Sequence, residues 1–239
     1  MPVVEVKSLA KVIDESIIVD RVSFSVQEGE IFGLLGSNGS GKTTTFNMLA
    51  GLLKPSSGTA KILGKKIGKD AELKRDIGFV TQQDSFYETL TVRENLEFFA
   101  SQCGITNKET IKKLLGQIKL STKADVLASS LSGGMKKRLN IGCSLVHGPR
   151  IIFLDEPTVG LDPVVRKEIW KMVEELHKEK KTIIITSHYM EEVEYLCSRV
   201  AVMFAGRIVA SGTPAQLKKK YKLKQMEDVF AHLMKREGR

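Results

Sequence analysis

The chain has 239 residues, a formal net charge of +9 and 42% hydrophobic residues. This length suits one large α/β domain that buries a core of its own, although the length alone would also permit two small domains. The longest apolar runs, such as Ile151–Leu154 and Ile183–Ile185, are too short to span a bilayer. No basic stretch precedes an apolar core at the N-terminus, which argues against a secretory signal. We therefore expect any link to a membrane to come through another chain.

The positive charge and the cysteines have ordinary explanations. Much of the charge lies in mixed helical segments such as Lys171–Lys181 and in the run Lys218–Lys220, so solvated faces are preferred over a nucleic-acid site. The three cysteines have no CxxC spacing. They are expected to be reduced, as in a cytoplasmic protein.

Strand-like runs rich in Val, Ile and Phe alternate with helical patterns along the chain. Strands are predicted at Ile17–Val26, Glu30–Leu35, Ile77–Thr81, Ile151–Asp155, Thr182–Thr186 and Val200–Phe204. Helices are predicted at Thr43–Leu52, Val92–Gln102, Lys108–Ile118, Gly134–Val146, Val164–Lys178 and Tyr189–Leu196. This alternation indicates an α/β fold with a mainly parallel central sheet.

Two segments depart from the alternation. Residues 84–147 contain one helical pattern after another, which predicts a helical subdomain inserted into the α/β core. Residues 216–239 form a tail of one or two short helices with an apolar side. That side consists of Leu223, Met226, Phe230 and Leu233. We expect it to dock on the core, with a partner-binding helix as the alternative.

A phosphate-loop sequence of the type GxxxxGK[ST] joins the strand Glu30–Leu35 to the following helix. It consists of Gly36, Ser37, Asn38, Gly39, Ser40, Gly41, Lys42 and Thr43. Glycines let backbone N–H groups close around phosphate oxygens, and the helix N-terminus adds the positive end of its dipole. We expect Lys42 to reach the β- and γ-phosphates, the Thr43 hydroxyl to bind Mg²⁺ and Thr44 to contact the α-phosphate.

Two adjacent carboxylates, Asp155 and Glu156, end the apolar run Ile151–Leu154. A continuous apolar run suits a strand that is buried on both faces. We expect Asp155 to hold Mg²⁺, directly or through water, and Glu156 to face the attacking water as general base. A structural aspartate followed by an exposed glutamate is the alternative.

The segment Leu131–Met135 reads Leu-Ser-Gly-Gly-Met and resembles the LSGGQ signature of ABC-type ATPases. Gly133 and Gly134 lead into a predicted helix and offer a second anion site. Since one chain needs only one phosphate loop, this site is expected to act on the ATP of a neighbouring copy in a two-fold dimer. Ser132, Gly133 and Gly134 would then contact that ATP across the interface.

Further matches to the same family follow in the expected order. Gln82 resembles the glutamine that senses Mg²⁺ and the attacking water, with Gln83 as the neighbouring alternative. Asp162 resembles the aspartate that meets the opposite subunit, and His188 resembles the histidine that contacts the γ-phosphate. Ile13 occupies the position of the family's adenine-stacking aromatic residue. Because it offers apolar contact without π-stacking, we expect weak discrimination between ATP and GTP.

The resemblance covers about Val3 to Gly212 and implies a single nucleotide-binding domain over residues 1–239. The implied fold is a P-loop NTPase core with a mainly parallel central sheet, an antiparallel β subdomain and an inserted helical subdomain. The implied activity is hydrolysis of ATP with Mg²⁺, by a homodimer or with a related ATPase subunit, coupled to a separate membrane-spanning permease. The runs Gly33–Gly36 and Met226–Phe230, together with Met135, resemble ABC-2-type exporter ATPases.

The alternative is a soluble ABC ATPase that acts on a protein assembly or on nucleic acid. The short distance from Gln82 to Ser132 leaves no room for a long coiled-coil insertion, which argues against the DNA-repair members of the family. Nucleic acid is therefore an improbable partner. We expect the chain at the inner face of the cell membrane, held by its permease, and the transported substrate to be chosen by that permease.

Overall fold

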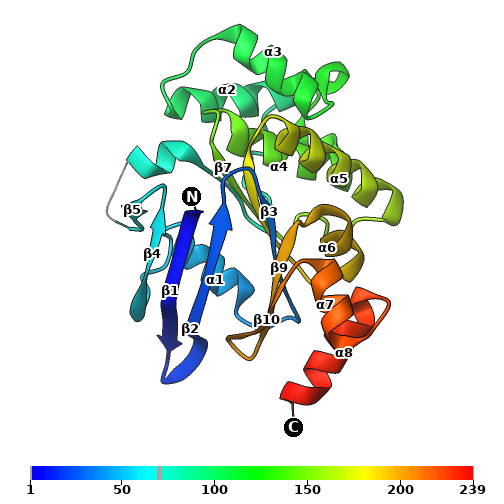
Figure 1. The fold of residues 1–239 in the computed structure, drawn as a ribbon. Helices are drawn as coiled ribbons and strands as arrows, with labels where there is room; N and C mark the ends of the chain where they lie inside the picture. Colours follow the sequence, from blue (N-terminus) through cyan, green and yellow to red (C-terminus); the bar gives the residue numbers. More distant parts are fainter. Residues whose placement is uncertain (1, 69–71, 239) are drawn as a thin grey trace.

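A computed structural model describes residues 2–68 and 72–238 (Figure 1). The predicted ends of the domain, residues 1 and 239, lie outside this range. The central sheet has the strand order β10-β9-β3-β8-β7-β6. Its strands are β3 (Ile31–Gly36), β6 (Ile77–Val80), β7 (Ile151–Asp155), β8 (Thr182–Ser187), β9 (Arg199–Phe204) and β10 (Arg207–Gly212). All neighbours are parallel except β9 and β10, so the predicted mainly parallel sheet is confirmed.

The inner strands are buried on both faces, and their side chains alternate between two cores. In β7, Ile152 and Leu154 join the core under the helices, whereas Ile151 and Phe153 join the core between the two sheets. This two-sided burial explains why the strand reads as an uninterrupted apolar run.

A second, four-stranded sheet has the order β2-β1-β4-β5 and is antiparallel throughout. It consists of β1 (Pro2–Ile13), β2 (Ser16–Gln27), β4 (Ser57–Ile62) and β5 (Lys65–Lys66). The predicted antiparallel β subdomain is thereby confirmed. Its inner face packs against one face of the central sheet and the helix α1 (Lys42–Leu49), which ends three residues before the predicted Leu52.

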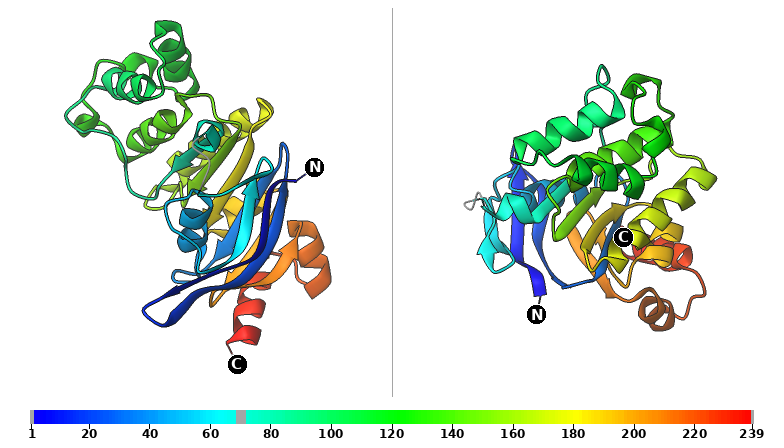
Figure 2. Two further views of the ribbon diagram at one scale, coloured as in Figure 1. Left: turned by 90° about the vertical axis from the view of Figure 1, so that its left-hand side faces the viewer. Right: turned by 90° about the horizontal axis from the view of Figure 1, so that it is seen from above.

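Helices cover the other face and one end of the central sheet. Figures 1 and 2 show three of them gathered at one end, away from the tip of the β1–β2 hairpin: α2 (Val92–Gln102), α3 (Lys108–Gln117) and α4 (Gly133–Leu145). Helix α2 begins at a capping box, in which Thr91 accepts from the Glu94 N–H and Glu94 accepts from the Thr91 N–H. Within residues 2–68 and 72–238, no helix has both the length and the apolar character required to cross a membrane.

The remaining helices are α5 (Pro163–Lys178), α6 (Met190–Leu196), α7 (Pro214–Tyr221) and α8 (Met226–Glu237). The predicted C-terminal tail thus contains α8 and most of α7. Met226, Val229 and Leu233 of α8 are buried in the main core, as expected for a docked tail. Phe230 and Leu223 are only partly buried at its border.

Candidate active site

Four parallel strands end at the same edge of the central sheet, and each is followed by a predicted functional residue. In the register, Leu35 of β3 pairs with Ser187 of β8, and Asp155 of β7 pairs with Thr186 of β8. The phosphate loop follows β3, Gln82 follows β6, Glu156 follows β7 and His188 follows β8. Ligands of open parallel sheets bind at the carboxyl ends of the strands, so this edge is the candidate active site.

The phosphate loop folds tightly because two of its glycines leave no room for a side chain. A Cβ at Gly36 would lie 2.4 Å from Ser40 Oγ, and a Cβ at Gly41 would lie 2.8 Å from the Ile18 carbonyl oxygen. Gly41 also has a φ of 97° and forms the N-cap of α1. The N–H groups in the first turn of a helix have no acceptor within the helix. They can therefore donate hydrogen bonds to an anion bound at this loop. Among the described residues, the buried Ser40 hydroxyl has no hydrogen-bond partner.

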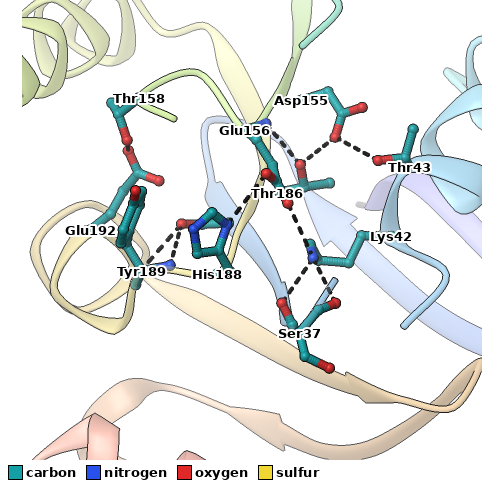
Figure 3. A network of polar contacts seen from close by, with 12 residues as sticks. Ser37, Lys42, Thr43, Asp155, Glu156, Thr158, Thr186, His188, Tyr189 and Glu192 are labelled. Atoms are coloured by element: carbon teal, nitrogen blue, oxygen red, sulfur yellow. Dashed lines mark hydrogen bonds and ion pairs between the residues drawn. The ribbon is translucent and has the colours of Figure 1, made fainter. Parts of the chain in front are cut away.

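Lys42 lies inside the site and is 4% exposed. Its Nζ donates to the Gly36 carbonyl at 2.8 Å and to the Ser37 carbonyl at 3.1 Å. The same ammonium lies 3.2 Å from Glu156 Oε1 (Figure 3). The structure therefore brings the predicted phosphate-binding lysine and the predicted general base into contact.

Asp155 is held by two hydroxyl groups. Thr186 Oγ1 donates to its Oδ1 at 2.5 Å, and Thr43 Oγ1 donates to the same atom at 3.3 Å (Figure 3). Burial raises the pKa of the Asp155 carboxyl above its ordinary value, and these hydrogen bonds act in the opposite direction. Thr186 was not predicted as a site residue, because only the pairing of β7 with β8 brings it beside Asp155.

The pair Thr43 and Asp155 fits Mg²⁺ as part of its ligand set. Mg²⁺ prefers oxygen ligands and usually keeps waters and substrate phosphates beside one or two carboxylates. Among the described residues there is no cluster of three or more His, Cys, Asp or Glu side chains that could hold a metal ion alone. Thr43 offers a hydroxyl oxygen and Asp155 a buried carboxylate beside the phosphate loop. These two groups suit an ion whose other ligands are waters and nucleotide phosphates.

Glu156 lies at the centre of the site and is 7% exposed. Its φ is 46°, in the left-handed region that non-glycine residues seldom adopt. Its N–H donates to Thr186 Oγ1 at 2.9 Å and to the Thr186 carbonyl at 3.2 Å. Its Oε2 lies 3.3 Å from Nδ1 of His188 (Figure 3). Backbone strain supported by specific contacts is frequent at functional sites.

A cavity of about 260 Å³ opens over the phosphate loop. It is lined by Ile18, Asn38, Gly39, Ser40, Gly41, Lys42, Thr43, Thr44, Gln82 and Glu156. Of the two adjacent glutamines, Gln82 lines this cavity. The Gln83 carbonyl instead accepts from Thr81 Oγ1 at 2.6 Å. Lys137 Nζ of α4 donates to the Gln82 carbonyl at 3.2 Å, a contact that the sequence did not indicate.

Ile13 lies outside this lining. It ends β1, is 42% exposed and pairs with Ser16 at the hairpin turn. Ile18 of the neighbouring strand lines the cavity instead. The role of Ile13 against the adenine ring stays a prediction.

Comparisons with known proteins identify the family. A family model described as ABC transporter matches residues 19–159, more than half of the chain. The chain belongs to the ABC transporter family. It is an ABC transporter ATPase.

Curated relatives of this ABC ATPase are transporter ATP-binding proteins from bacteria. The linearmycin resistance ATP-binding protein LnrL of Bacillus subtilis (strain 168) is 42% identical over 89% of this chain and 70% of its own length. The Nod factor export ATP-binding protein I of Burkholderia pseudomallei (strain 1710b) is 43% identical over 90% of this chain and 72% of its own length. The probable multidrug ABC transporter ATP-binding protein YbhF of Escherichia coli (strain K12) is 41% identical over 90% of this chain. The chain spans only 38% of YbhF.

Solved structures confirm the fold. An ATP-binding subunit of an ABC transporter superposes with a TM-score of 0.85 at 26% identity, covering 97% of this chain and 99% of that one. A dimeric structure of the ATP-binding cassette MJ0796 with ADP and Pi has a TM-score of 0.78 at 28% identity. That match covers 88% of this chain and 98% of MJ0796.

The signature segment of this ABC ATPase does not join the cavity over its own phosphate loop, whose lining contains none of Ser132, Gly133 and Gly134. Ser132 is the N-cap of α4, which begins at Gly133, one residue before the predicted start. A Cβ at Gly134 would lie 2.3 Å from Val165 Cγ1, whereas a Cβ at Gly133 would have 3.8 Å to its nearest neighbour. Gly134 therefore has a packing role within the chain, and its contact with a neighbouring ATP stays a prediction.

Asp162 also has a structural role within the chain. It is the N-cap of α5, and its Oδ1 accepts from the N–H groups of Val164 and Val165, each at 3.0 Å. Cap aspartates typically contribute about 1 kcal/mol to stability. The predicted contact of Asp162 with an opposite subunit stays a prediction.

Proposed function

We propose that this ABC ATPase is the energising subunit of an exporter, which closes as a dimer around two Mg-ATP molecules and drives a separate membrane-spanning permease. One observation carries the catalytic part. Lys42, Glu156 and His188 form a continuous chain of contacts at the sheet edge, with Thr43 and Asp155 beside it (Figure 3).

Catalysis in this site relies on positioning and charge neutralisation. Lys42 and the backbone N–H groups of the phosphate loop bind the β- and γ-phosphates. Bound Mg²⁺ would neutralise phosphate charge, held by Thr43 and Asp155 with Gln82 at its water shell. Glu156 orients the attacking water and accepts its proton as the bond between the β- and γ-phosphates breaks. His188 contacts the γ-phosphate and holds Glu156 in place.

The second half of each site comes from a neighbouring copy or a related ATPase subunit. Ser132, Gly133 and Gly134 lie at a helix N-terminus that does not reach the cavity of their own chain, which supports a contact across a two-fold interface. Asp162 would meet the opposite subunit at the same interface. The dimeric structure of the related MJ0796 supports this arrangement.

An exposed apolar surface beside the Gln82 loop supports docking of a membrane partner. Tyr87 is 49% exposed, and its ring lies 4.9 Å from that of Phe98, which is 36% exposed. Two hydrogen bonds hold the loop at this point: buried Asn95 accepts from the Tyr87 N–H at 2.8 Å and donates to the Tyr87 carbonyl at 2.9 Å. Exposed aromatic residues on a fixed loop favour a protein interface.

Export as the direction rests on the relatives. The Nod factor export ATP-binding protein I carries the word export in its name, and YbhF is named a probable multidrug ABC transporter ATP-binding protein. We infer that this chain likewise acts at the inner membrane face through its permease, whose own residues select the substrate.

Purification from detergent-solubilised membranes of the native host tests this function. Co-purification of a stoichiometric multi-helix membrane protein, with ATPase activity that Glu156→Gln abolishes, is the expected result. Recovery with soluble proteins or nucleic acid alone would keep the ATPase and overturn the exporter.

A further inference from the structure

A buried carboxylate lies behind the catalytic residues and has no part in the mechanism above. Glu192 of α6 is 1% exposed. Its Oε1 accepts from Thr158 Oγ1 at 2.7 Å and from the Trp170 indole N–H at 2.8 Å. Both donors are buried as well, at 0% and 2% exposure. Within the described part of the chain Glu192 has no salt-bridge partner, and its Oε2 has no hydrogen-bond partner.

The chain positions of these groups connect two catalytic loops. Thr158 follows Glu156 by two residues, and Glu192 follows His188 by four residues. Figure 3 shows the Thr158–Glu192 pair on one side of the site and the Glu156–His188 contact next to it. The hydrogen bond therefore joins the loop after β7 to the start of α6, just behind the place where the two catalytic side chains meet.

The loop after β7 requires such a support. Glu156 has a φ of 46°, a conformation that persists in a non-glycine residue only where the surroundings hold it. The hydrogen bonds between its N–H and Thr186 fix its backbone on one side. On the other side, Thr158 anchors the loop to Glu192.

An apolar side chain would fill this position at less cost if packing were its only role. A buried carboxylate is expensive, and burial raises the pKa of Glu192, with the Arg166 charge and the hydrogen bonds to Glu192 acting in the opposite direction. What a carboxylate offers instead is one oxygen that accepts two hydrogen bonds from different elements, α5 and the loop after β7. Networks of this kind fix a unique geometry when their donors are satisfied.

We propose that Glu192 is a positioning residue for ATP hydrolysis, which ties the loop carrying Glu156 to the segment carrying His188. This inference rests on the proposed ATPase mechanism. Loss of the hydrogen bond between Thr158 and Glu192 lets the Glu156 carboxylate move away from His188. The phosphate loop after β3 still binds nucleotide. Removal of this hydrogen bond therefore lowers kcat and leaves ATP binding unchanged.

Three variants and a matched control test the proposal on the full chain with Mg-ATP. Glu192→Ala removes the acceptor, Thr158→Val removes one donor, and Glu192→Gln keeps an acceptor oxygen. Thr182→Val is the control, because Thr182 is also buried and hydrogen-bonded, to the Gly29 N–H at 2.9 Å, but lies at the far end of β8. For each variant, kcat, KM, the Kd for ADP and the thermal midpoint are measured.

Glu192→Ala is expected to lower kcat about tenfold with KM and Kd nearly constant, since small displacements of catalytic groups have effects of this size or larger. Thr158→Val is expected to lower kcat by a smaller factor, Glu192→Gln to retain most of the wild-type kcat, and Thr182→Val to retain all of it. If Glu192→Ala does not fold, the kcat of Thr158→Val decides whether Glu192 has the proposed positioning role.

An unchanged kcat in folded Glu192→Ala or Thr158→Val would contradict a positioning role for Glu192. So would a loss of kcat in Thr182→Val equal to that in Thr158→Val, or a Glu192→Gln variant no better than Glu192→Ala. An inactive wild-type protein would instead refute the proposed function itself, so the two failures are distinguishable.

Discussion

The phosphate-loop edge and the signature segment differ in how much of their chemistry the chain completes. At the sheet edge, Lys42, Glu156 and His188 contact each other within one chain. At the start of α4, Ser132 accepts a hydrogen bond from the Met135 N–H, and Gly134 packs against Val165 of the same chain. The contacts that we propose for catalysis are therefore present within one chain, whereas in the proposed mechanism the signature segment contacts ATP only in a dimer.

The largest expected effect comes from the catalytic half. Glu156→Gln should lower kcat by about 10²–10⁴, because a general base contributes factors of this size. The KM for ATP should change little, since the phosphate loop is intact. Steady-state phosphate release measures the effect, with the exposed Glu28→Gln as control. A Glu156→Gln enzyme with wild-type turnover would remove Glu156 from its role.

The signature half is expected to show a separation between activity and stability. Gly133→Ala should reduce kcat about tenfold or more by blocking the contact with the neighbouring ATP, while its thermal midpoint stays unchanged, because a Cβ has room there. Gly134→Ala should lower stability by about 1–3 kcal/mol through its clash with Val165. Full activity in Gly133→Ala would contradict a contact across the interface.

Sequence patterns predicted the strands around the candidate site well and several other strands poorly. Asp155, Glu156 and His188 end strands that are apolar on both faces, so their common edge followed from the alternation of strands and helices. The strand β1 escaped prediction because bulges and a positive φ at Ser8 interrupt its alternation. In β4 only two residues are buried, so it carries little apolar signal.

The contacts behind the site lay beyond sequence reasoning for a different reason. Thr158 and Glu192 are 34 residues apart and join by a single hydrogen bond. No spacing pattern connects such a pair until the strands between them are placed. Likewise, the cap role of Asp162 depends only on neighbouring residues. It does not reveal whether the same side chain also contacts a second chain.

A smaller effect is expected at Asp155, the carboxylate that is predicted to bind Mg²⁺. Burial raises the pKa of Asp155 above 3.8 in the folded protein. The stability linked to this raised pKa is therefore fully present below pH 3.8 and is lost as the pH rises through the pKa of the folded state. Without Mg²⁺, Asp155→Asn should therefore have a higher thermal midpoint than the wild type at pH 8, and this advantage should shrink as the pH falls toward 3.8. The exposed Asp125→Asn should show no such gain. A constant difference across this range would contradict the assignment.

The smallest expected effect lies at the hairpin. Ile13→Tyr should lower the KM for ATP by a few-fold, since aromatic stacking contributes about 0.5–1.5 kcal/mol beyond burial. In the wild type, the KM for GTP should lie within about tenfold of that for ATP, because Ile13 offers no stacking. Steady-state kinetics with both nucleotides measure this. A larger preference for ATP would show that other residues read the base.

The most direct test of the two-chain site is the mass of Glu156→Gln in solution, measured by light scattering with Mg-ATP and again with Mg-ADP. We expect a stable dimer with Mg-ATP and a monomer with Mg-ADP, because in the proposed site the γ-phosphate joins the phosphate loop of one chain to Ser132 of the other. A protein that binds Mg-ATP stoichiometrically and remains a monomer at all concentrations would contradict it.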